Sequence, residues 1–174
     1  MWLCDKRVLV IHGHASFKGV APWSWRSKHI ARSRQEQLES GGDGFEEQIA
    51  AVRTASIQAA TGAFANHRPG PVHMAMLGFP AVFHILLGWW RFPSLTTQWA
   101  QRFAPSAKYI ITGHTHHAGI WNRNGRIIIN TGCFGFPSHP RAVVIDGERI
   151  VVHKIVKRDN DYSLGPVLGS WDAL

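Results

Sequence analysis

Short apolar runs separated by turn residues mark the two ends of the chain. Residues 8–11, Val-Leu-Val-Ile, form a β-branched run ending at His12, which is typical of a buried strand with polar residues at its carboxyl end. Runs of strand composition also occupy 108–112, 118–121, 126–130, 142–145 and 149–155. Asn124-Gly125 and Asp146-Gly147 lie between such runs, and these pairs are the strongest short sign of a β-hairpin. The pattern predicts one early strand and a strand-rich last third.

The middle of the chain has helical character instead. Residues 24–40 have helical composition, with Arg32 and Glu36 spaced for an i,i+4 ion pair. Residues 45–66 place their apolar side chains on one face and form the stronger helix prediction. A further helix is predicted over 94–103, with Ser94 as its N-terminal cap. Residues 156–174 are polar and irregular, and we expect them to form a C-terminal tail.

Residues 72–90 contain no formally charged side chain over 19 positions. This length meets that of a membrane-spanning helix. Glycine, proline and histidine residues within the stretch argue against a span: Gly78, Pro80, Gly88, His73 and His84. A buried core segment and an apolar lid are the alternatives. For both histidines of the stretch, a hydrogen-bonded structural role is favoured over a role in binding substrate.

Composition indicates one globular domain, because 45% of the 174 residues are apolar and only 17% are charged. The net charge of +8, with histidines counted as neutral, favours anionic partners such as phosphorylated substrates, nucleic acid or an acidic membrane face. A generic basic surface is the alternative. The basic residues are scattered and form no patch interleaved with aromatic residues, so no nucleic-acid partner is expected.

The cysteines and the first residues indicate the compartment. Cys4 and Cys133 make neither a disulfide framework nor a Cys-x-x-Cys pair, which favours a reducing environment. Asp5, Lys6 and Arg7 follow only four residues, so the start lacks the apolar core of a signal peptide. We therefore expect a cytoplasmic protein.

Histidines follow two of the predicted strands. The apolar run 110–112 leads into Gly113-His114-Thr115-His116, and the first strand leads into His12. Two histidines at i and i+2 on extended backbone point the same way, so both imidazoles can approach one metal cluster. Gly113 is expected to let the backbone turn tightly at the strand end. The two strand ends together predict a metal site.

These residues resemble the calcineurin-like metallophosphoesterases. Gly113-His114-Thr115-His116 is similar to the closing motif of that family, and Ile11-His12-Gly13-His14 is similar to the isolated histidine motif that precedes it. The run 127–130 followed by Thr131-Gly132-Cys133 resembles the strand and turn that come after the closing motif. The matches, in this order, extend from about residue 6 to residue 155 and leave the long middle unmatched.

The resemblance implies a calcineurin-like α/β sandwich in incomplete form, as its C-terminal half. The partial domain would cover 1–155, with a helical lid or cap at about 24–103 and an irregular tail at 156–174. The complete family site holds two divalent ions, Mn, Fe or Zn, and by resemblance His12 and His114 bind one ion and His116 the other. Imidazole suits such ions, and a two-metal site activates a water molecule for attack on phosphorus.

The chain also departs from the family. The earlier motifs Asp-x-His, Gly-Asp-x-x-Asp and Gly-Asn-His-Asp/Glu should precede His12, and only eleven residues do. We therefore expect a truncated or split gene product that is weakly active alone, and no catalytic acid is assigned. His14 and His117, beside the ligands, are expected to support them or to face solvent.

The 102-residue interval from His12 to His114 is similar to that of the branch containing UDP-2,3-diacylglucosamine pyrophosphatase, which inserts a helical lid there to hold acyl chains. Trp89, Trp90 and Arg91 would then suit peripheral contact at the inner membrane face. The expected activity is hydrolysis of a phosphomonoester, phosphodiester or pyrophosphate on a small-molecule or lipid-linked substrate. A non-catalytic binding module and a membrane-associated scaffold held by 72–90 are the alternatives; the substrate, the metal and the oligomeric state stay open.

Overall fold

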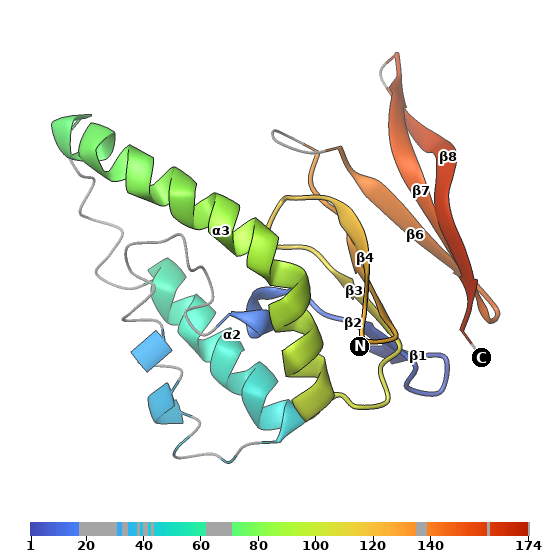
Figure 1. Cartoon of the computed structure of the whole chain (residues 1–174), viewed down its shortest axis with the longest axis horizontal. Coiled ribbons are helices and arrows are strands. Elements are labelled where there is room, and N and C mark those ends of the chain that lie inside the picture. Colours follow the sequence, from blue (N-terminus) through green and yellow to red (C-terminus); the bar gives the residue numbers. More distant parts are fainter. Residues whose placement is uncertain are drawn as a thin grey trace. The chain divides into compact units, whose positions relative to one another are not determined.

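The computed structural model describes residues 1–17, 31–32, 35–37, 39, 42, 44–61, 71–134, 139–159 and 161–173. The chain has a mixed α/β structure (Figure 1). It divides into two compact units. The first unit joins Met1–Gly13 to Thr96–Leu174, and the second unit is His14–Leu95. All the strands among these residues lie in the first unit.

A five-stranded sheet forms the base of the first unit, in the order β1-β2-β3-β5-β4. Its strands are β1 Trp2–Leu3, β2 Val8–Val10, β3 Tyr109–Thr112, β4 Gly119–Arg123 and β5 Arg126–Asn130. The three central strands run parallel, and β1 and β4 pair antiparallel at the edges. Continuous Val and Ile runs suit such strands, which are buried on both faces. The register pairs Val10 with Ile111, so the carboxyl ends of β2 and β3 lie side by side.

A three-stranded antiparallel sheet completes the first unit, with β6 Arg141–Asp146, β7 Arg149–Arg158 and β8 Asp161–Asp172 in that order. Both predicted hairpins are confirmed, joining β4 to β5 and β6 to β7. At the first turn, Asn124 and Gly125 have φ values of 51° and 73°. This left-handed backbone is what a two-residue hairpin turn requires.

The predicted irregular tail is wrong. Residues 156–158 continue β7, and Asp161–Asp172 form β8, which pairs with β7 along most of its length. Register shifts between Val152 and His153 and between His153 and Ile155 break the regular pairing. Gly165 and Gly169 lie in the same part of β8, and glycine and bulges interrupt the alternation by which a strand is recognised.

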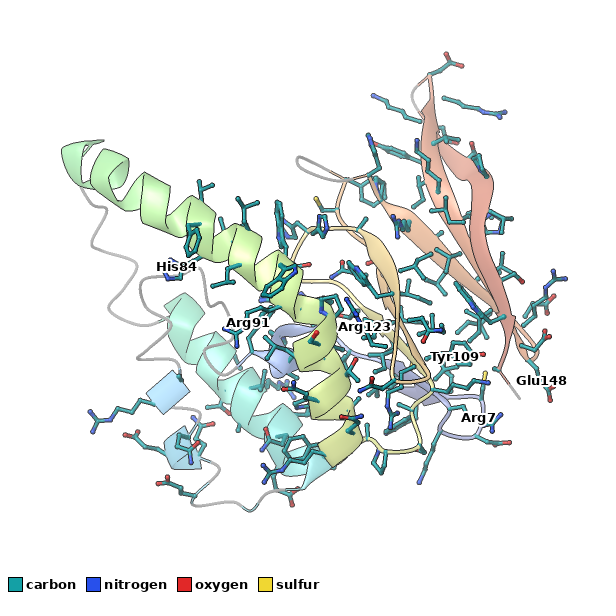
Figure 2. The ribbon with its side chains drawn as sticks, in the orientation of Figure 1. Arg7, His84, Arg91, Tyr109, Arg123 and Glu148 are labelled. Carbon is teal, nitrogen blue, oxygen red and sulfur yellow. The ribbon has the colours of Figure 1, made fainter. Side chains whose placement is uncertain are left out.

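The core of the first unit lies between its two sheets. Its fully or nearly fully buried members are Val8, Tyr109, Ile111 and Ile129 from the five-stranded sheet and Ile150, Val152 and Ala173 from the other side. Polar contacts close the same interface: the Tyr109 hydroxyl donates to the Asp172 carbonyl at 2.7 Å, and an Arg7 guanidinium nitrogen donates to the Ala173 carbonyl at 3.2 Å. Figure 2 labels Arg7 and Tyr109 at this junction. The last strand is therefore part of the folded domain.

Helices make up the described part of the second unit. It contains the short 3-10 helix η1 His14–Ser16, the helix α2 Phe45–Thr61 and most of α3 Pro71–Phe103. The predicted helix 45–66 is confirmed as far as Thr61, and 62–66 lie outside the described residues. Most of the predicted helix 24–40 also lies outside them, although its Arg32–Glu36 ion pair forms at 2.9 Å.

The predicted separate helix at 94–103 is wrong, because α3 runs unbroken through 33 residues and Ser94 caps nothing. Pro93 lies inside this helix and is buried next to Phe92, whose ring contacts Phe17 at a centroid distance of 5.8 Å. A proline removes one helical hydrogen bond, and packing of its apolar neighbours can offset that loss.

Along the described part of the chain, no helix combines the length and the apolar composition that a bilayer crossing needs. Instead, α3 exposes large apolar side chains at Val82, Phe83, Leu86 and Trp90, and Trp90 is 77% exposed. Their spacing places them along one side of the helix. Figure 2 labels two further side chains of α3, His84 and Arg91.

Tyr109→Phe tests the attachment of the last strand. Loss of the hydrogen bond to the Asp172 carbonyl should lower the free energy of unfolding by about 1 kcal/mol, measured by urea denaturation. Tyr162→Phe, at a half-exposed tyrosine of the same strand β8, is the matched control and should change it by less than about 0.5 kcal/mol. Equal losses in the two variants would contradict a specific bond at Tyr109.

Candidate metal centre

The candidate site lies where β2 and β3 end. Beyond the paired residues, the Ile11 amide donates to the Ile111 carbonyl at 3.0 Å, and the Gly113 amide donates to the His12 carbonyl at 3.3 Å. The two chain segments therefore stay in contact past the strand ends. The His12 and His114 rings meet edge to face, with centroids 4.9 Å apart. The structure thus brings together two of the three predicted ligands, which are 102 positions apart in the chain.

The ligating atoms of His12, His14 and His114 lie within 4.8 Å of one another. Only Gly13 separates His14 from His12, so the chain itself holds His14 close to the pair. The sequence had placed His14 outside the ligand set and His116 inside it. His116 is exposed and is absent from this group of three, although it is close enough to His12 to influence its ionisation.

The reason for this difference is the backbone after β3. His114 and His116 have φ values of 73° and 58°, in the left-handed region. The expectation that both lie on extended backbone and point the same way is therefore wrong. Between them, Thr115 is buried, so the loop turns inward at the threonine and presents the two histidines separately. The φ values of the loop, which a His-x-His spacing does not reveal, decide where each imidazole points.

Asn130 holds this loop in place. The residue ends β5 and is fully buried, and its amide group donates to the Gly113 carbonyl at 2.9 Å and to the Thr115 hydroxyl at 2.8 Å. Its side-chain oxygen accepts from the Gly132 amide at 3.0 Å. One side chain therefore ties the strand end to both neighbouring loops. The sequence places Asn130 at the end of a predicted strand but does not predict its role in holding the loop. The available sign of that role is a polar residue directly after an Ile-Ile-Ile run.

The tight turn of the site belongs to Gly13 rather than Gly113. Gly13 has a φ of 99°, and a Cβ atom there would clash with the Thr112 hydroxyl and lie 2.9 Å from the Gly113 carbonyl. At Gly113 a Cβ atom would make only ordinary contacts, 3.7 Å from the Thr131 hydroxyl. Close approach of the two loops therefore requires glycine at position 13.

The surroundings of His12 and His117 favour the neutral forms of these two residues. Burial lowers the pKa of His12 below its ordinary value of 6.5, and the nearby charge of His116 lowers that pKa further. Burial likewise lowers the pKa of His117, with a second contribution from the Arg141 guanidinium. Neutral imidazole offers the lone pair that a metal ion requires. The lowered pKa of His12 therefore favours its metal-binding form.

Carboxylates are absent from the long part of the sequence that carries His114, His116 and His117. Residues 48–145 contain no Asp or Glu, although they contain eight Arg and Lys residues. The group of potential ligands found in the described part of the chain consists of histidines alone. Three imidazole nitrogens fit a Zn²⁺, Mn²⁺ or Fe²⁺ ion by chemistry. A tetrahedral ion with bonds of about 2.0–2.1 Å would draw its ligands to about 3.4 Å from one another, closer than the 4.8 Å within which these atoms now lie.

Comparisons with known proteins add little to these residues. No protein-family model matches the chain, and no curated protein matches it significantly. The solved structure of vacuolar protein sorting 29 from Cryptosporidium parvum is similar to it with a TM-score of 0.34 and 20% sequence identity, over 46% of this chain and 44% of that one. This chain thus aligns with less than half the length of that protein.

Gly13→Ala and Gly113→Ala form a matched pair that tests the turn. Gly13→Ala should lower the free energy of unfolding by about 2 kcal/mol or more, because alanine is strained at a positive φ and meets Thr112. Gly113→Ala should change it by less than about 1 kcal/mol. Urea denaturation measures both values, and similar losses in the two variants would show that the approach at Gly13 is not tight.

The ionisation of His12 can be followed by NMR titration in metal-free buffer. We expect a pKa below 6.5, and His116→Ala should raise it without restoring the ordinary value, because burial is the larger cause. Because the pKa of His12 is lower in the folded chain, the unfolded chain binds a proton at this residue at a higher pH. The contribution of His12 to the free energy of unfolding therefore falls as the pH drops below about 6.5. His153→Ala is the control, and an unchanged pKa in His116→Ala would contradict the coupling.

Proposed function

We propose that this chain binds a divalent transition-metal ion through His12 and His114, with His116 and His14 as the further donors, and that the site serves phosphoester hydrolysis of the metallophosphoesterase type. The observation that carries the proposal is the meeting of His12 and His114 at the ends of two adjacent parallel strands. The sheet brings the two strand ends together, and Asn130 fixes the loop that follows β3, so the ligands have a rigid support. The substrates in view are a phosphomonoester, a phosphodiester or a pyrophosphate.

The chain's own residues support such a role in two ways. Partial burial of the His12 ring lowers its pKa and so favours the neutral form that binds a metal ion, although the residue as a whole is exposed. Asn130 fixes the loop that carries His114 and His116 by bonds to Gly113 and Thr115. A bound ion would supply Lewis acidity and lower the pKa of a water molecule. The histidines would hold the ion, and the hydrogen-bonded loop would keep their orientation.

A finer assignment follows from the second unit. Within the metallophosphoesterases, we propose the branch that contains UDP-2,3-diacylglucosamine pyrophosphatase, because a helical unit lies between His12 and His114 in the chain. The apolar side chains that α3 exposes, Val82, Phe83, Leu86 and Trp90, suit a lipid-linked substrate or a peripheral contact with a membrane face. Cytoplasmic location is part of the same proposal.

A second candidate is a metal-binding module without catalysis. The composition of the histidine group favours it, because no carboxylate joins that group among the described residues. Two-metal hydrolysis uses two ions about 3.5–4 Å apart, and a bridging carboxylate commonly holds them. With imidazoles alone the chain would hold one ion, and hydrolysis would be slow.

Calorimetry with Mn²⁺ and Zn²⁺ tests the shared part of both candidates. We expect one ion to bind per chain, and His12→Ala and His114→Ala should each weaken binding by about tenfold or more, because the remaining ligands cannot make up the loss. His116→Ala tests the third predicted ligand in the same way. His153→Ala, at a histidine on β7, is the matched control and should leave the affinity unchanged. Absence of binding in a folded chain would overturn the proposal.

Hydrolysis of a chromogenic phosphodiester separates the two candidates. We expect turnover far below about 1 per second, the lower end of typical enzymes, that is lost on His114→Ala. Turnover above that level would show that carboxylate ligands within the chain complete a two-metal site. Turnover that persists in His114→Ala would place the activity elsewhere, and metal binding without any turnover would favour the non-catalytic module.

A further inference from the structure

Two basic residues face each other where β6 begins. The register between β6 and β7 is unbroken from the Asp146–Arg149 pair at the hairpin to the Arg141–Lys154 pair at the other end. Residues directly opposite each other in an antiparallel pair have their side chains on the same face of the sheet. Arg141 and Lys154 are therefore immediate neighbours, and we refer to them as the basic pair.

The basic pair lies on the inner face of its sheet. Side chains alternate along a strand, so Arg141 shares a face with Val143 and Ile145, and Lys154 shares a face with Ile150 and Val152. Those four apolar residues belong to the core between the two sheets or pack against it. The pair consequently continues the core-facing row, and both members are half-buried. The inward-facing side chains of β6 and β7 are thus apolar along the core and positively charged at its edge.

This edge is the one next to the histidines. The Arg141 amide donates to the Thr131 carbonyl at 2.9 Å, and the Thr131 amide donates to the Thr112 carbonyl at 2.9 Å, one residue before Gly113. The Arg141 guanidinium is also close enough to His117 to affect its charge. Two successive hydrogen bonds thus connect the start of β6 to the end of β3, where the loop bearing His114 and His116 begins.

The arrangement suits a bound anion. Like charges directly across a strand pair repel, and half-burial removes part of the water that would screen them. Burial also lowers the pKa of Arg141. Among the described residues neither side chain of the pair forms an ion pair with a carboxylate. The nearest acidic residues along the chain are Asp146 and Asp159, each five residues from a member of the pair.

We propose that Arg141 and Lys154 form a binding position for a phosphate-type oxyanion beside the histidine loop. Arginine presents a planar fork that binds two phosphate oxygens at once, and lysine adds a point charge. The anion position stands by itself. Its role in catalysis rests on the proposed function: the pair would hold a second phosphoryl group while the histidine site receives the first. The substrate class would then be a pyrophosphate rather than a monoester.

Inorganic pyrophosphate is the probe, measured by calorimetry at low ionic strength with a chelator present. Arg141→Gln and Lys154→Gln should each weaken binding by about tenfold or more, because each removes charge-assisted hydrogen bonds. Arg149→Gln and Lys157→Gln remove the same charge from exposed positions of β7 and should change binding less than about twofold. Inorganic phosphate should bind more weakly than pyrophosphate. Equal losses in all four variants, or no binding by the wild-type chain, would overturn the proposal.

A second measurement needs no variant. Phenylglyoxal modifies accessible arginines, and pyrophosphate should protect Arg141 but leave Arg123 and Arg149 open to modification, as read by mass spectrometry of the wild-type protein. Absence of protection at Arg141 would overturn the anion position even if a variant failed to fold.

The two proposals can fail separately. His114→Ala should keep pyrophosphate binding in chelator, and Arg141→Gln should keep Mn²⁺ affinity. If the chain binds no metal ion but its pyrophosphate binding depends on Arg141, the anion position is retained and the proposed function is removed. If the chain binds a metal ion but its pyrophosphate binding does not change in Arg141→Gln, the proposed function is retained and the anion position is removed.

Discussion

The parallel pairing of β2 with β3 is the constraint on which the site depends. It joins the start of the chain to a strand about a hundred positions later and aligns their carboxyl ends, so that His12 and His114 meet. Closing so long a loop costs conformational entropy that the intervening segment does not repay locally. Burial of Val8, Leu9, Ile110 and their neighbours on both faces of the sheet offsets that cost. The histidines are thus held together by the same contacts that form the core.

The pairing alone does not orient the imidazoles, because the chain beyond β3 adopts unfavourable backbone geometry. Left-handed conformations at two non-glycine residues, His114 and His116, cost about 1–3 kcal/mol each. Asn130 compensates: its buried amide and oxygen make three hydrogen bonds to the two loops, each stronger in a dry interior than in water. Strained backbone held by a buried polar network is commonly found where a side chain must be aimed. The strain is therefore consistent with a binding role for these histidines.

The sequence predicts those features of the structure that are determined by a few neighbouring residues. Strand composition, Asn-Gly and Asp-Gly turns, and histidines after apolar runs depend on a few neighbouring residues, and these predictions agree with the structure at β2–β7 and at the His12–His114 contact. The aim of His116, the bulged strand β8 and the passage of α3 through Pro93 depend on residues distant in the chain. Left-handed φ values at histidine and bulges between strands have no short sequence sign, so periodicity did not reveal them.

The distribution of charge connects the histidine loop to the rest of the first unit. Between Glu47 and Asp146 the chain contains no carboxylate, so every formal charge in the stretch that builds β3, β4 and β5 is positive. Repulsion among such charges is tolerated on an exposed surface, where water and salt screen it. It is much less tolerated at Arg141 and Lys154, which face the core edge. Half-buried cations beside the histidine loop make an environment that stabilises added negative charge. Metal-held phosphoryl groups would bring that charge, and an anion at the basic pair would offset both the half-buried cations and the positive charge of an ion held by the histidines.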